Sequence, residues 1–209
     1  MRGRSLLATC LFSLLGSCVG PGNGLRRIEH PEQPLEHRGV VCYPPAEGAW
    51  WLGEDEEQTE SGLLFREDLG APDPSAKIGP STFITLFIAD TPPAEFSKHY
   101  PGQHAALEAL ARAAARPSSG RFKDLSSETS WGTLQGQEFV RLTRSREERD
   151  NPVDPAAVLR EDERTTWLFH PHQPATVVRV VVSHRRPAGG EFPSLVELEQ
   201  SFLARLAFR

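Results

Sequence analysis

The sequence predicts an α+β fold, an antiparallel sheet with a mid-chain helix and a C-terminal helix packed on it. An Ala-rich segment over residues 103–116 has an apolar stripe with helical spacing. A second amphipathic segment begins near Ser194 and runs towards the end of the chain. Short segments typical of β-strands lie before and between these two helices. Strands with segregated helices are the pattern of the α+β class.

The first half of the domain contains four predicted strands. Three of them are short, over residues 40–43, 50–52 and 63–65, and each is bounded by turn-forming residues. The fourth, over residues 83–88, is apolar on both faces. A strand of this kind is expected at the centre of a sheet, where both of its faces are covered.

The second half predicts two pairs of strands and a closing helix. The expected strands are residues 125–131, 139–143, 165–170 and 175–183, and residues 144–155 are expected to form a polar loop. Ser194 and Glu197 match a capping box. The apolar stripe of the closing helix consists of Leu195, Leu198, Phe202, Leu203 and Leu206.

The N-terminal residues predict an export signal. Arg2 and Arg4 precede an apolar run that is long enough for a signal-peptide core and too short to span a bilayer. The run ends at Leu15, Gly16, Ser17 and Cys18, which resemble a bacterial lipobox. This resemblance implies cleavage before Cys18 and acylation of its thiol and its new amino group. Secretory cleavage near residue 20 and an uncleaved anchor are the alternatives.

The lipobox interpretation sets the domain boundaries and the expected location. Residues 1–17 are the predicted lipoprotein signal peptide, residues 18–37 a flexible tether rich in Pro, Gly and charge, and residues 38–209 a single α+β domain. The chain is then expected in the bacterial cell envelope, bound to a membrane through its N-terminal lipid. Val19 replaces the aspartate that retains some lipoproteins at the inner membrane, which favours the outer membrane.

The cysteines are coupled to this interpretation. Cys10 leaves with the signal peptide, and acylation of Cys18 leaves Cys42 without an intrachain partner. If Cys18 is not acylated, a bridge between Cys18 and Cys42 is possible in an oxidising compartment. The surroundings of Cys42 predict a buried residue on a strand.

The composition argues against nucleic acid as a partner. The formal net charge is −5, whereas proteins that bind phosphate backbones usually have a basic excess. The same charge disfavours electrostatic attraction to anionic lipid, so membrane contact is expected through Cys18.

The order of elements resembles the PsbP/DcrB-like fold of small bacterial lipoproteins. The features that resemble it are the 83–88 strand before the 103–116 helix, the hairpin at Gly136 and the closing helix that ends near Phe208. The interruption at residues 100–102 and the long 144–155 loop depart from the pattern. The resemblance implies a small binding or assembly factor and supplies no catalytic residues.

Several residues are candidates for metal binding or catalysis. His170 and His172 could share a metal, but a zinc site needs three or four ligands, so a solvated turn is the preferred interpretation. Calcium at the acidic run 54–60 or at Asp150, Asn151 and Asp154, and a hydrolase triad using a serine, His184 and an acid, stay open as weaker alternatives. The sequence predicts no cofactor and no metal site.

Trp50 and Trp51 are the strongest non-catalytic candidates. Adjacent residues of a strand face opposite ways, so one tryptophan can be buried while the other contacts a partner protein or a glycan. The predicted function is therefore a non-enzymatic, lipid-anchored binding or assembly factor with an envelope protein as possible partner. The alternatives are an exported envelope enzyme of the hydrolase type and a periplasmic protein that binds a small ligand or a metal.

Overall fold

A computed structural model describes residues 25–56, 60–68, 79–90, 96, 98–118, 120–151, 154–187 and 194–209. The predicted signal peptide and the lipobox residues Leu15, Gly16, Ser17 and Cys18 lie outside these residues. Among the described helices, none is both long and apolar enough to cross a membrane.

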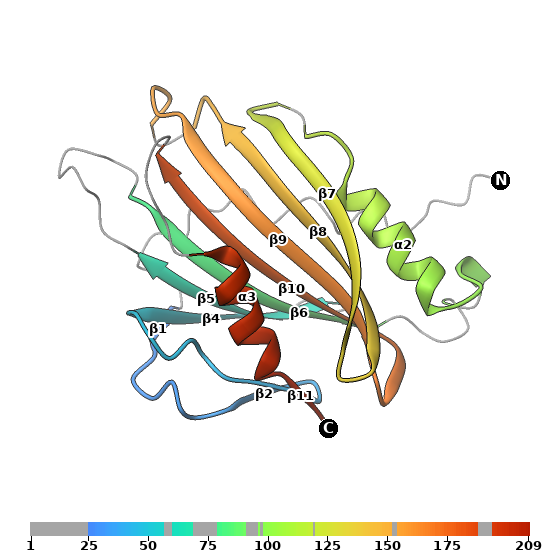
Figure 1. Cartoon of the computed structure of the whole chain (residues 1–209). Coiled ribbons are helices and arrows are strands. Elements are labelled where there is room, and N and C mark those ends of the chain that lie inside the picture. Colours follow the sequence, from blue (N-terminus) through green and yellow to red (C-terminus); the bar gives the residue numbers. More distant parts are fainter. Residues whose placement is uncertain are drawn as a thin grey trace.

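The structure confirms the α+β class, with a large antiparallel sheet and two helices (Figure 1). The strands of this sheet are, in spatial order, β1 (Arg26–Arg27), β4 (Trp50–Glu56), β5 (Glu60–Asp68), β6 (Ser81–Asp90), β10 (Gln173–Pro187), β9 (Leu159–His170), β8 (Gln137–Glu148) and β7 (Phe122–Leu134). A small sheet contains β11 (Ala207–Phe208), β3 (Val40–Cys42) and β2 (Leu35–His37). The helices are α2 (Gln103–Ala114) and α3 (Leu195–Ala204).

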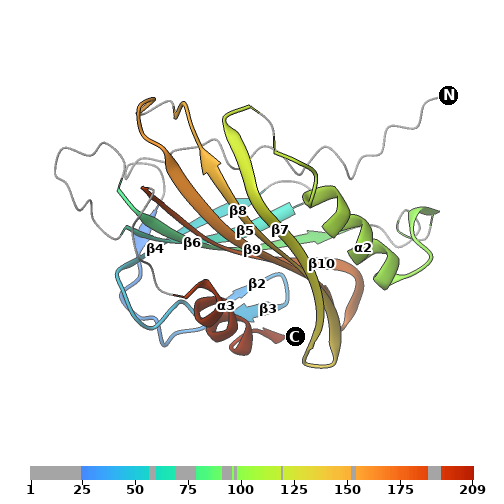
Figure 2. The ribbon, with the colours of Figure 1, turned by 45° about the horizontal axis from the view of Figure 1, so that its top comes forward.

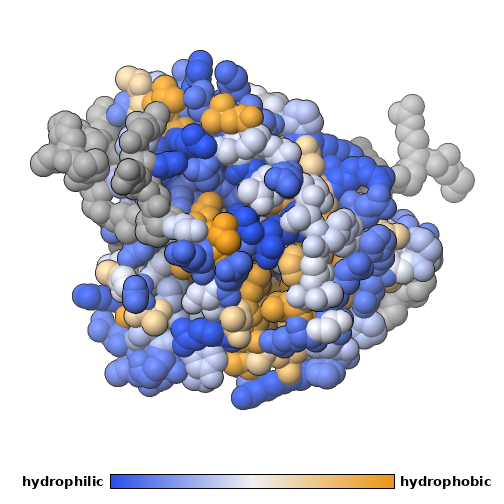
Figure 3. Space-filling model, viewed as in Figure 1, coloured by the Kyte–Doolittle hydropathy of each residue, from blue (hydrophilic) through white to orange (hydrophobic). Residues whose placement is uncertain are grey.

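Helix α3 and the small sheet cover one face of the large sheet, here called the α3 face (Figure 2). Val178, Val180 and Val182 of β10 point to this face and are fully buried, together with alternate residues of β5 and β6. Phe202 and Leu203 of α3 pack against them. The outer surface of this face is largely hydrophilic, with apolar side chains gathered beside α3 (Figure 3).

Helix α2 packs on the opposite face, here called the α2 face, over β8 and β9. Its Leu107 and Ala111 form a second core with Val140 and Leu142 of β8 and Trp167 of β9. The expectation that β6 lies at the centre of a sheet is confirmed, because β5 and β10 pair with its two edges. The closing helix is also confirmed, since Ser194 Oγ accepts a hydrogen bond from the backbone N–H of Glu197 at 3.4 Å.

Two segments expected to lack regular structure contain strands. Within residues 18–37, the expected tether, Arg26–Arg27 pair with β4 and Leu35–His37 pair with β3. The polar loop expected over residues 144–155 is wrong in its first part, because β8 continues to Glu148. The charged residues of β8 find partners on neighbouring strands, and these pairings allow polar side chains to occupy a strand.

The β7–β8 hairpin, predicted around Gly136, turns at Gln135 and Gly136. Both residues have positive φ, 51° and 80°, as a two-residue turn of the mirror-image type I requires. A Cβ atom added at Gly136 would meet nothing within 4 Å. A side chain at this position would therefore lower stability only through the strain of a positive φ, and not through a steric clash.

We expect Gly136→Ala to lower the free energy of unfolding by about 1 kcal/mol, because a left-handed φ is costly for a residue with a Cβ atom. Gly102→Ala is the matched control, since a Cβ atom there also meets nothing within 4 Å while φ is 170°, an extended value. Urea unfolding of the two variants measures the difference. Equal losses of stability would contradict the turn assignment.

Candidate interaction surface

The two adjacent tryptophans lie on opposite faces of β4. Trp50 is 3% exposed in the core of the α3 face, and its Nε1–H donates to the Glu47 carbonyl at 2.6 Å. Trp51 points to the α2 face and is 37% exposed. Of the two tryptophans that the sequence offers as partner contacts, Trp50 is therefore a core residue, and Trp51 is the one exposed to solvent.

Trp51 lies in a row of side chains that crosses the sheet, with Arg27 of β1 opposite it on one side. It pairs with Arg66 of β5, and Arg66 pairs with Phe83 of β6. The Arg66 guanidinium lies 5.8 Å from the centre of the Phe83 ring and bonds Asp68 at 2.8 Å. These contacts fix the guanidinium over the sheet. We call Trp51, Arg66 and Phe83 the Trp51 row.

The neighbouring positions on the same face are half-buried and mostly apolar. Leu64 of β5, Thr85 of β6 and Val181 of β10 form the next row across the strands. Leu25 lies against Gly53, where an added Cβ atom would come within 2.7 Å of its side chain. The Trp51 row is thus continuous with a mostly apolar row on the α2 face, while α2 packs farther along this face, over β8 and β9.

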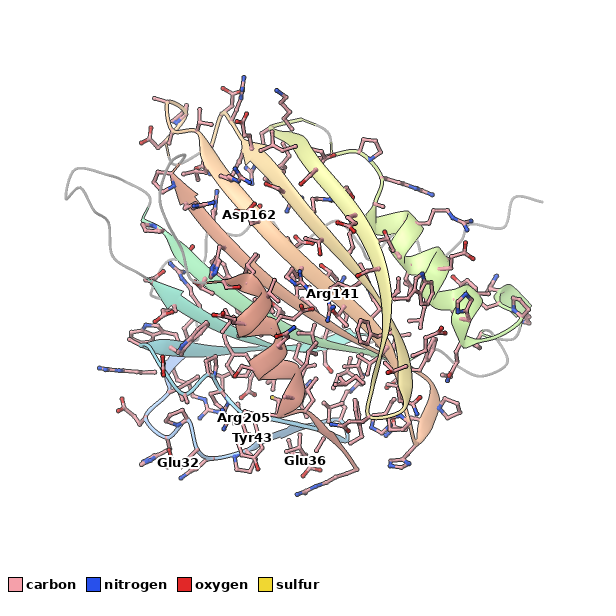
Figure 4. The ribbon with its side chains drawn as sticks, in the orientation of Figure 1. Glu32, Glu36, Tyr43, Arg141, Asp162 and Arg205 are labelled. Carbon is pink, nitrogen blue, oxygen red and sulfur yellow. The ribbon has the colours of Figure 1, made fainter. Side chains whose placement is uncertain are left out.

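Glu199 is the most deeply buried carboxylate on the α3 face, at 0% exposure. It accepts hydrogen bonds from Arg141 at 2.8 Å, from Arg164 at 2.6 Å and from the Thr166 hydroxyl at 2.6 Å. Arg141 rises from the sheet beside α3 (Figure 4). Since α3 contributes the carboxylate and β8 and β9 contribute the guanidiniums, this cluster joins the helix to the sheet.

A second charged cluster lies on the α2 face at the far end of the sheet. Arg146 binds the two oxygens of Glu161 at 3.1 Å each and lies 3.5 Å from Glu163. Burial raises the pKa of the Glu161 carboxyl above its usual value, and the Arg146 guanidinium opposes this rise without cancelling it.

In the same cluster Glu148 is buried and bonds Arg121, Arg185 and Asn151. Asn151, one residue of the weaker calcium alternative, therefore points inward and bonds Glu148 of the same chain. Each acidic group of the cluster faces a guanidinium or an amide, which makes the cluster a structural one.

The weaker triad alternative names His184 and leaves its serine and its acid unspecified. His184 Nδ1 lies 2.9 Å from Thr82 Oγ1, and Ser145 Oγ of β8 donates directly to the Asp162 carboxylate of β9 at 2.6 Å. A triad needs the histidine between the serine and the acid. Ser145 is instead bonded to the acid itself, and both Thr82 and His184 are buried.

The solvated turn predicted for His170 and His172 is wrong for His170, which is fully buried. Its Nδ1 accepts from the His172 backbone N–H at 3.2 Å, so its Nε2–H donates to the Gly39 carbonyl at 3.2 Å. Both ring nitrogens are used within the fold. In the part of the chain that the structure describes, no three His, Cys, Asp or Glu residues are grouped to hold a metal.

Cys42 is buried on a strand of the small sheet, as the sequence predicts, and it forms no disulfide among the described residues. Burial raises the pKa of the Cys42 thiol to about 12. The thiolate, which is the reactive species, is therefore scarce in the folded chain at neutral pH.

Sequence reasoning missed Arg66, Phe83 and Glu199. The first two become neighbours of Trp51 only through the register of β4, β5 and β6, which a single sequence does not give. Glu199 had a detectable signal, because it lies within the apolar stripe of the closing helix, four positions after Leu195.

Comparisons with known proteins establish no family. No family model matches the chain, and no curated protein matches it. The solution structure of cyanobacterial PsbP (CyanoP) from Synechocystis sp. PCC 6803 matches with 14% identity and a TM-score of 0.48, covering 93% of this chain and 99% of that one. The crystal structure of the Saccharomyces cerevisiae Ran-binding protein Mog1p matches with 11% identity and a TM-score of 0.41, covering 88% and 96%. Both TM-scores lie below 0.5, so the PsbP/DcrB-like fold stays a prediction.

We expect Glu199→Ala to destabilise the chain by about 3 kcal/mol, because it leaves two mostly buried guanidiniums, 16% and 14% exposed, without their carboxylate. Glu197→Ala is the control on the same helix. Its carboxylate is exposed, so a loss below about 1 kcal/mol is expected. Urea unfolding measures both, and a Glu199 variant as stable as the control would show that the cluster does not hold α3.

Cys42 is expected to resist iodoacetamide at neutral pH in the native chain and to react after unfolding in urea. The reason is the shift of its pKa to about 12 together with its burial. Peptide mass mapping of the fragment containing Cys42 separates it from the other two cysteines. Rapid native labelling at this residue would contradict the burial of the small sheet.

Proposed function

We propose that this chain is a non-enzymatic binding or assembly factor of the bacterial cell envelope, held at a membrane by a lipid on Cys18. The Trp51 row is its contact for a partner protein. The export signal and the lipobox pattern that ends at Cys18 support the location, and the surface geometry supports the binding role.

The observation that favours this function most is the Trp51 row itself. Trp and Arg are the residue types that dominate binding energy at protein interfaces. Here an exposed Trp, a guanidinium held by Asp68 and a Phe lie side by side on a sheet. Such a surface loses little conformational freedom when a partner binds, which favours affinity.

The internal use of the polar groups also favours binding over catalysis. Ser145, His184, Glu161 and Glu199, which would be the natural groups for hydrolysis, all bond to other protein groups. A hydrolase needs a nucleophile and a base that are aligned and open to substrate. The described groups instead stabilise contacts between strands and between the sheet and α3.

A photo-crosslinking amino acid placed at residue 51 is expected to form one dominant adduct with an envelope protein in intact cells. The same amino acid at residue 196, where Val196 is similarly exposed on α3, is the control and is expected to give none. Trp51→Ala should weaken binding of the captured protein at least about fivefold, as removal of an interface hot spot does, and Val196→Ala should not. Equal adducts at both positions would reject the Trp51 row as the contact.

The same cells test the location separately. Intact mass and membrane fractionation of the native chain should give an N-terminus at Cys18 with added acyl mass, and Cys18→Ser should release the chain from the membrane. An unmodified Cys18 would reject the lipid anchor while leaving the crosslinking result to decide the binding surface.

A further inference from the structure

Strand β7 is a long free edge of the large sheet. It contains 13 residues and is the terminal strand, paired only with β8 among the described strands. All its residues are exposed or half-buried. At the other end of the sheet the strand is β1, which has only 2 residues, both of them Arg. A short edge strand with charged side chains discourages pairing with another chain. Strand β7 is long, and most of its length carries no charge.

The part of β7 that can accept another strand is residues 126–134. A register shift between Asp124 and Ser126 interrupts the ladder with β8 at the start of the strand. After this shift the sequence SSETSWGTL contains no Pro and a single charge, Glu128. These residues offer a regular edge of about 30 Å, with unpaired backbone groups along it.

We propose that two copies of this chain pair antiparallel through β7, with the two-fold axis at Ser130. Directly opposed residues in an antiparallel pair point to the same face, so a symmetric pairing must have a residue on its axis. Ser130 is the midpoint of residues 126–134. This register alone pairs the whole regular edge of each copy.

The side chains are self-complementary in this register. Trp131 lies opposite Thr129 of the second copy, and the two Trp131 side chains become diagonal neighbours within contact distance. Trp131 is 41% exposed in the single chain, and its ring is held by stacking on His104 at 4.4 Å. Pairing would bury this preoriented aromatic surface.

The charges favour the same register. Glu128 lies opposite Gly132 of the second copy, so the two carboxylates do not meet. A register centred on Glu128 would instead oppose the two carboxylates directly, which destabilises a strand pair. Glu128 thus selects against the alternative register.

A second copy is favoured over a strand of another protein because the near-neutral edge brings no like charges opposite each other when it pairs with itself in this register. The inference is independent of the Trp51 row, since β4 lies near the opposite end of the sheet. The two surfaces can therefore be tested separately.

Two double variants test the pairing and its register in the full chain. Residues 127 and 133 are exposed, lie about 20 Å apart on one strand, and come directly opposite each other only between two copies. With Ser127→Glu and Thr133→Lys, the Glu of each copy lies opposite the Lys of the other copy, which gives two pairs of opposite charges. Ser127→Glu with Thr133→Glu places like charges there, and the two variants differ at one residue only.

Sedimentation velocity over a range of concentrations is expected to show a dimer of the purified native chain. The Glu/Lys variant should dimerise at least as tightly, and the Glu/Glu variant should have a dissociation constant about tenfold or more higher than the Glu/Lys variant. Circular dichroism and urea unfolding confirm that both variants fold. A native chain that stays monomeric overturns the proposal and points to a strand of another protein at β7. Equal dissociation constants for the two variants overturn it as well.

Discussion

The buried carboxylate of Glu199 is the interaction on which the arrangement of the α3 face depends. A carboxylate with no exposure to solvent is tolerated only when cations and hydroxyls replace its water, and here Arg141, Arg164 and Thr166 do so. These partners come from β8 and β9, so the helix can satisfy its own charge only in one position over the sheet. With the helix in that position, Phe202 and Leu203 close the apolar core over the valines of β10.

This use of charge explains where function can lie. Charged residues on β8, β9 and β10 bind one another or α3, and the histidines with buried rings bond within the fold. His170, His184 and Asn151, which the sequence offers for chemistry, thus bond within the fold. The two surfaces proposed for other molecules lie towards the two ends of the sheet, the Trp51 row near one end and the free edge of β7 at the other.

The sequence predicted those elements whose signal is local. Alternating valines in β10, the doubly apolar β6 and the capping box at Ser194 each identify an element without knowledge of the rest of the chain. The extension of β8 to Glu148 could not be predicted, because its charged residues are typical of a loop until their partners on other strands are known. The pairing of Leu35–His37 in the small sheet was missed for a similar reason, since its stabilising contacts are distant in sequence. The choice between Trp50 and Trp51 depends on which face α3 covers, which the alternation of a strand does not specify.

Amide hydrogen exchange of the purified chain, alone and mixed with solubilised envelope membranes, tests most directly whether the Trp51 row binds a partner. We expect slower exchange of β4, β5 and β6 around Trp51, Arg66 and Phe83 when the membranes are present, with α3 unchanged. Unchanged exchange in these strands, or protection confined to the α3 face, would contradict it.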